Sequence, residues 1–183
     1  MRVWIRTPFS TEKNLGKAYN EEMQMIPEGD AACFIDGDLM FLTHDYGNIL
    51  NDYANLYPNS VLVCRMNRIN AKATGQIDQY APTTSDIADH IKHANSLSSS
   101  RAVTRLQMPP VSGALMVVPK SVWNKIKFAE QQPYEDRGPF NLLGVDNDWT
   151  NRVRAAGIEI LTMEGLYCWH TYRLLTNTNK HLL

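Results

Sequence analysis

Two aspartates, Asp36 and Asp38, follow a short apolar run in the first quarter of the chain. The run Ala31–Ile35 has the length and bulk of a buried strand, and the acids come directly after it. Open α/β sheets bind ligands at the edge where such strands end. Two carboxylates this close repel each other unless a cation lies between them, and Mg²⁺ or Mn²⁺ bound with phosphate oxygens is the natural candidate. A simple turn is the alternative interpretation, because Asp-Gly is a common turn dipeptide.

The composition is that of a globular domain. The chain has 183 residues, of which 44% are hydrophobic and 20% charged, and this length suits one domain. Its 18 basic and 19 acidic residues give a formal net charge of −1, so no basic field exists to attract nucleic acid or an anionic membrane. Cys33, Cys64 and Cys168 lie in apolar runs without metal-binding spacing, which predicts reduced, buried thiols. We therefore expect a cytoplasmic protein with no signal peptide and no membrane span.

Stretches typical of strands and of helices alternate along the chain. Apolar runs predict strands at Val3–Ile5, Ala31–Ile35, Val61–Cys64, 111–118, Ile158–Leu161 and Leu166–Trp169. Apolar residues at helical spacing predict helices at Asn14–Ile26, Tyr46–Leu56, Ile87–Leu97 and Asp146–Ala156, with a short helix from Ser121. This alternation predicts an α/β fold with a mixed, mostly parallel central sheet flanked by helices.

Three motifs follow one another in a characteristic order. They are Asn14-Leu15-Gly16-Lys17-Ala18-Tyr19-Asn20 before Asp36-Gly37-Asp38, then Gly144-Val145-Asp146-Asn147-Asp148-Trp149 with Arg152 and Gly157, and finally Trp169-His170. Over about residues 1–173, this order resembles the GT-A-fold glycosyltransferases, especially family 2 of the nucleotide-sugar transferases. That family has a helix of the form N-x-G-x-A-x-N before its D-x-D strand. A later acidic segment and a terminal histidine complete its site.

The resemblance implies one compact GT-A-like, Rossmann-like domain over residues 1–183. Residues 1–70 would form the nucleotide-sugar and metal-binding part, and residues 101–175 the acceptor and catalytic part. The chain departs from the family at two places. Val145 stands where a glutamate is usual, and Val3–Arg6 alone precedes the first motif, where the family has two strands and a helix.

The same resemblance assigns roles to individual residues. Those expected to bind the metal, Mn²⁺ or Mg²⁺, are Asp36, Asp38 and His170, and those expected to bind a UDP- or GDP-sugar donor are Asn14, Lys17, Asp36 and Arg173. Asp146 aligns with the acid that deprotonates the acceptor hydroxyl. Asp148 and Trp149 are expected on the acceptor side or at the helix cap, and Arg152 is expected to pair with one of the two acids. A carboxylate at a helix N-terminus is favourable whatever its role, so structural capping is an alternative for both acids.

The function that follows is a metal-dependent glycosyltransferase of the hexosyl or N-acetylhexosaminyl type. It would move a sugar from a nucleoside diphosphate to an acceptor hydroxyl. Inversion is the expectation from family 2, and retention is the alternative, because related GT-A enzymes with the same D-x-D and histidine retain configuration. One alternative is a nucleotidyltransferase or other phosphoryl-transfer enzyme, which also uses paired aspartates after a strand, although the chain has no G-x-x-x-x-G-K phosphate loop. Another is a non-catalytic module that binds nucleotide sugars.

Overall fold

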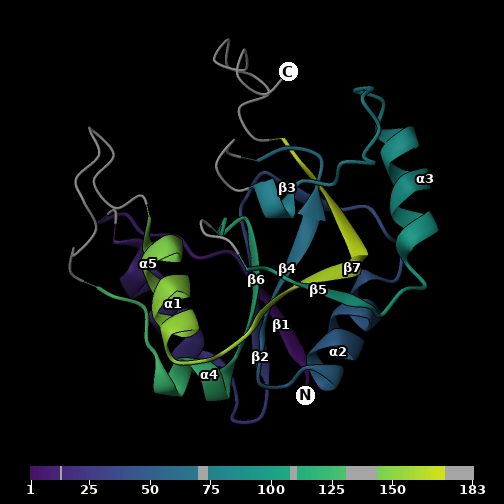
Figure 1. The fold of residues 1–183 in the computed structure, drawn as a ribbon. Helices are drawn as coiled ribbons and strands as arrows, with labels where there is room; N and C mark the ends of the chain where they lie inside the picture. Colours follow the sequence, from purple (N-terminus) through teal and green to yellow (C-terminus); the bar gives the residue numbers. More distant parts are fainter. Residues whose placement is uncertain (13, 70–73, 108–110, 131–143, 172–183) are drawn as a thin grey trace.

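The computed structural model describes the chain apart from residues 13, 70–73, 108–110, 131–143 and 172–183. Its fold is α/β, as predicted, with one curled mixed sheet and helices on both faces (Figure 1). No helix in the described ranges is both long and apolar enough to cross a membrane.

The sheet is mixed, with antiparallel pairs in the majority. Its strands are β1 (Val3–Arg6), β2 (Ala31–Ile35), β3 (Leu39–Phe41), β4 (Val61–Met66), β5 (Val103–Arg105), β6 (Leu115–Pro119) and β7 (Ile160–His170). They lie in the order β1-β2-β6-β4-β7-β3, and β5 also pairs with β7. Only β1–β2 and β4–β7 are parallel among the described pairs. The prediction of a mostly parallel sheet was therefore wrong, because β6 runs against both of its neighbours and the short strands β3 and β5 run against β7.

The helices agree closely with the sequence pattern. They are α1 (Leu15–Met25), α2 (Tyr46–Leu56), α3 (Ile87–Leu97), α4 (Lys120–Lys125) and α5 (Val145–Ala155), with a 3-10 turn at Thr74–Gln76. Helices α1, α4 and α5 gather on one side of the sheet, and α2 and α3 lie on the other (Figure 1). The apolar residues of α1, α2 and α5 recur on one face, which packs on the sheet. Helix α3 differs, because it buries His90 and Ala94 and leaves Ile87 and Ile91 exposed.

Alternate residues of β2 belong to different hydrophobic cores. Ala32 and Phe34 pack in the core beneath α1, α4 and α5, whereas Ala31 and Cys33 pack in the core beneath α2. Side chains of a strand point to opposite faces in turn, so a strand that is apolar throughout needs cover on both faces. The three cysteines are free and buried, as predicted.

Strand β7 is longer than the sequence pattern indicated. Two strands joined by a turn were predicted between residues 158 and 169, but a single strand runs from Ile160 to His170. Gly165, which would suit a turn, instead permits close packing, because a Cβ there would collide with the backbone of Ser100. Its N–H donates to the Tyr53 hydroxyl at 2.7 Å. The glycine is therefore a packing residue inside a strand.

Asn14 caps helix α1. Its side-chain oxygen accepts the Lys17 N–H at 3.0 Å, and its amide donates to the Glu130 carbonyl at 2.8 Å. We expect Asn14→Ala to lower the free energy of unfolding by about 1 kcal/mol, the usual worth of such a cap. This loss corresponds to a fall in Tm of about 2–4 °C in a chain of this size, measurable by calorimetry. Asn14→Ser is the control, because it keeps a capping oxygen and loses the Glu130 contact as Asn14→Ala does. An unchanged Tm in Asn14→Ala would contradict the assignment.

Candidate functional site

The acidic pair lies in the connection between β2 and β3. The Asp36 N–H donates to the Ala114 carbonyl at 3.0 Å, and the Leu39 N–H closes the turn on the Asp36 carbonyl at 3.2 Å. Strand β3 then pairs antiparallel with β7, with Leu39 opposite His170. This pairing brings Asp38 beside a histidine 132 positions later in the chain. The turn predicted from Asp-Gly and the predicted acidic site are thus the same structure.

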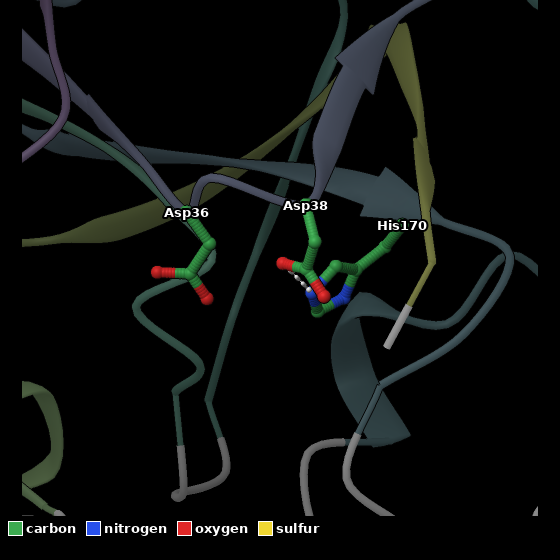
Figure 2. Close-up of side chains that lie close together, drawn as sticks. All are labelled: Asp36, Asp38 and His170. Atoms are coloured by element: carbon green, nitrogen blue, oxygen red, sulfur yellow. Dashed lines mark hydrogen bonds and ion pairs between the residues drawn. The ribbon is translucent and has the colours of Figure 1, made fainter. Parts of the chain in front are cut away.

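Asp36, Asp38 and His170 form the group that could hold a metal ion. One ligand atom from each residue lies within 4.8 Å of the other two. The His170 Nε2 atom is 3.2 Å from the Asp38 Oδ1 atom, and the His170 ring extends from β7 toward the turn that carries the two aspartates (Figure 2). Both aspartates are exposed, whereas His170 is 2% exposed. The group therefore has a buried histidine on one side and two solvent-exposed carboxylates on the other.

The backbone around His170 sets its tautomer. The Nδ1 atom is 3.0 Å from the carbonyl oxygen of Arg68, which can only accept, so Nδ1 carries the proton that is donated. The His170 N–H donates to the Asn67 Oδ1 atom at 2.7 Å. In the neutral ring the lone pair is then on Nε2, which faces Asp38. A histidine held in this way through Nδ1 is prepared for metal coordination through Nε2.

The charges at the site also favour a cation. Although Asp36 as a residue is exposed, the protein atoms around its carboxyl group partly desolvate that group and raise its pKa above the usual range. The charges of Asp38 and Asp146 raise this pKa further, against the opposing effect of His170. A divalent cation between the acids would remove this repulsion. Two carboxylates and one imidazole suit Mn²⁺ better than Mg²⁺, which prefers oxygen ligands alone. The residues present therefore fit a divalent metal.

Asp146 is a second, separately held carboxylate at the start of α5. Its Oδ2 atom accepts the Gly113 N–H at 2.7 Å, and its Oδ1 atom accepts the Asn147 N–H at 2.9 Å. Burial raises the pKa of Asp146, and these backbone hydrogen bonds oppose part of the rise. Its charge acts on Asp36 as well as on Tyr19. Gly113 is followed by Ala114, whose carbonyl accepts the Asp36 N–H, so two consecutive residues connect Asp146 with the acidic turn.

Tyr19 lies next to Gly113 and Asp146 but was not among the predicted site residues. The side chain is 3% exposed, and its pKa is raised by burial and by the charges of Asp146 and Asp36. Its ring stacks on Phe128 with centroids 4.6 Å apart and meets Phe34 edge-on at 4.6 Å. Tyr19 lies inside the 14–20 motif, which was the available signal, but a tyrosine at helical spacing predicts only a core position.

The remaining residues of the acidic helix have structural contacts. The Asp148 Oδ2 atom accepts from Arg152 Nε at 3.0 Å and Nη2 at 2.7 Å, so the predicted pairing of Arg152 with one acid is confirmed. Asp148 is not the helix cap, since Gly144 has that position with φ at 110°. Trp149 is fully buried and donates from Nε1 to the Ile126 carbonyl at 2.7 Å. Its prediction on the acceptor side was wrong, because the helical period turns this residue into the core.

The residues predicted to bind the donor have other contacts in the structure or lie outside it. Asn14 caps α1, and the Lys17 Nζ atom is 3.1 Å from the Glu12 Oε2 atom at the surface. The donor-binding roles of these two residues stay predictions. Arg173 lies outside the described residues.

Comparison with protein-family models and with curated proteins found no match for this chain. Its function must therefore be argued from the arrangement of its own residues.

Proposed function

We propose that this protein is a metal-dependent glycosyltransferase with a GT-A-like fold. It transfers a hexosyl or N-acetylhexosaminyl group from a UDP- or GDP-sugar to an acceptor hydroxyl, with inversion. The observation that carries the proposal is the convergence of Asp36, Asp38 and His170 within 4.8 Å at the end of β2, with Asp146 nearby. A turn that had only a structural role would not need a histidine whose Nε2 atom faces Asp38.

The three side chains have complementary tasks in this proposal. A divalent cation bound by Asp36, Asp38 and His170 would neutralise the charge that develops on the departing nucleoside diphosphate. Three protein ligands leave coordination positions for phosphate oxygens. Asp36 and Asp38 are exposed, so a diphosphate can reach them, whereas the buried His170 is kept in orientation by backbone contacts.

Asp146 would accept the proton of the acceptor hydroxyl. Desolvation raises its pKa, and a carboxylate with a raised pKa is a stronger base once ionised. Its two backbone hydrogen bonds hold both oxygens, so the group can act without first changing position. Catalytic acids and bases commonly have a perturbed pKa, and the raised pKa of Asp146 supports an enzyme over a non-catalytic module.

The sheet supports the GT-A-like assignment in one respect. Strands β1 and β2 are parallel, with Arg6 opposite Phe34, so both end at the edge where Asp36 lies. The carboxyl ends of parallel strands are the usual ligand-binding edge of an α/β sheet. We place the nucleotide at this edge, next to the metal-binding group.

Metal-dependent nucleotide binding provides the first test. We expect Mn²⁺ with UDP or GDP to raise Tm much more than either component alone, because the diphosphate completes the metal coordination. A ligand at about 100 times its Kd raises the free energy of unfolding by about 2.7 kcal/mol, which corresponds to a rise in Tm of roughly 5–10 °C for a chain of this length. The measurement is a thermal shift series with and without EDTA, followed by a screen of UDP-, GDP- and CMP-sugars for Mn²⁺-dependent hydrolysis. Nucleotide binding that is equally tight in EDTA would contradict the proposal.

A further inference from the structure

We propose that Gly113 is a positioning residue for Asp146, and that the segment Ser112-Gly113-Ala114 ties this carboxylate to Asp36. We call this segment the 112–114 strap. The inference rests on the proposed function for the role of Asp146 as a base. The geometry of the strap itself does not depend on that role.

Two consecutive residues of the strap each bind one of the two acids. The Gly113 N–H donates to the Asp146 Oδ2 atom at 2.7 Å, and the Ala114 carbonyl accepts the Asp36 N–H at 3.0 Å. Leu115, the next residue, begins β6 and pairs with Ile35 of β2. The strap therefore joins the candidate base to the backbone of a candidate metal ligand through a single peptide unit.

Only glycine fits at position 113 without moving Asp146. A Cβ at this position would lie 3.1 Å from the Asp146 Cβ atom, 3.2 Å from its Oδ2 atom and 3.4 Å from the Tyr19 hydroxyl oxygen. Gly113 is not among the glycines with positive φ, so the requirement comes from space and not from backbone conformation. Because Tyr19 is stacked on Phe128, it cannot easily retreat, and the carboxylate would have to shift.

A buried glutamine holds the strap from its other end. The Gln76 Oε1 atom accepts the Ser112 N–H at 2.7 Å, and Gln76 Nε2 donates to the Ser112 carbonyl at 3.4 Å. Gln76 is fully buried, and the Ser112 hydroxyl oxygen also accepts the Ala114 N–H at 3.2 Å. The strap is thus fixed on both sides of Gly113. A rigid support of this kind is what a base needs if it is to keep its place relative to the metal-bound donor.

The first experiment compares Gly113→Ala with Gly47→Ala, whose new Cβ would meet no atom within 4 Å. We expect Gly113→Ala to lower kcat for sugar transfer by about 3–10-fold, with the Mn²⁺ affinity and the donor KM unchanged, because the carboxylate shifts by less than the misplacement of about 1 Å that costs about 100-fold. Gly47→Ala should keep the wild-type rate. In the Asp146→Asn background, Gly113→Ala should cause no further loss, because it acts through that carboxylate. Additive losses or an unchanged kcat would overturn the inference.

A second variant covers the case in which Gly113→Ala does not fold. Gln76→Met keeps the buried volume but removes both hydrogen bonds to Ser112, and it should lower kcat with the same lack of additivity toward Asp146→Asn. A reduced kcat that is fully additive with Asp146→Asn would overturn the inference.

The third measurement does not depend on any reaction. Loss of a hydrogen bond that favours the carboxylate should raise the pKa of Asp146, measured by carboxyl ¹³C NMR titration of wild type and Gly113→Ala or Gln76→Met. An unchanged Asp146 titration would overturn the positioning role. A shifted titration in a protein that transfers no sugar supports the positioning role and overturns the proposed function.

Discussion

Replacement of Asp146 by asparagine should lower sugar transfer by about 10²–10⁴-fold, the usual worth of a placed proton acceptor. The metal and donor do not bind through Asp146 in the proposal, so the affinity for Mn²⁺ and for the nucleoside diphosphate should change little. The measurement is kcat for transfer beside a calorimetric titration of the nucleotide. Slow hydrolysis of the donor should persist, because the metal-binding group is intact.

The structure also predicts what this substitution does to stability. Each oxygen of Asp146 accepts a backbone N–H, from Gly113 or from Asn147. Asparagine offers one oxygen and one NH₂ group, so one buried N–H would face another donor. We expect a cost of about 1–3 kcal/mol, and the rate comparison must be made well below Tm.

Asp148→Asn is the matched control for Asp146→Asn. Asp148 lies on the same helix, but its contact is a partly exposed ion pair with Arg152. Such a pair within a helix contributes only about 0.3–0.5 kcal/mol. Asp148→Asn should therefore keep most of the transfer activity. Equal rates in wild type and Asp146→Asn would rule out Asp146 as the base, and equal losses at both positions would leave the base unassigned.

The helices could be predicted from the sequence almost to their end residues. In α2 and α3 the apolar positions recur regularly, and the bounds Tyr46–Leu56 and Ile87–Leu97 agree with the structure. The strands β3 and β5 were missed because each has three residues, too few for a period to be seen. Their existence depends on β7, which lies far away in sequence and provides the partner for both. The antiparallel direction of most neighbouring strands was missed for the same reason, because it depends on which distant segments of the chain pair.

The part of the candidate site that consists of ionisable side chains could be predicted. Asp36 and Asp38 were selected from their types and spacing, whereas His170 was selected only from the resemblance to GT-A-fold glycosyltransferases, and the structure brings the three together. The supporting parts could not be selected in this way. Gly113 contributes a backbone N–H and the absence of a side chain, and neither can be recognised from the residue type alone. For Trp149 the error was in the other direction. Its place in a motif suggested a functional role, but its position on the helix places it in the core.

Replacement of Asp38 by asparagine should abolish metal-dependent nucleotide binding without harming the fold. Even residues that only support a metal ligand are worth about 10–100-fold in affinity, so we expect loss of a direct ligand to weaken Mn²⁺-dependent binding of UDP or GDP by more than about 100-fold. Transfer should fall in proportion. Isothermal titration of the nucleotide in Mn²⁺ measures this loss.

The metal-free Asp38→Asn protein should be at least as stable as wild type. In wild type, the Asp38 carboxylate is 3.2 Å from the Nε2 atom of His170, and in the neutral tautomer held by Arg68 this atom is an acceptor. This comparison holds at a pH where the imidazole ring is neutral, because two acceptors then face each other, whereas an asparagine amide can donate a hydrogen bond to Nε2. At lower pH the charged ring pairs with Asp38, and Asp38→Asn loses that ion pair. The substitution also removes one charge from the neighbourhood of Asp36, where Asp38 raises the pKa. Tm of the protein in EDTA measures the effect, with Glu21→Gln at an exposed position of α1 as a control for charge loss. A fall in Tm of many degrees in Asp38→Asn would instead show that the acidic pair serves the turn, and unchanged nucleotide affinity would show that the metal-binding group lies elsewhere.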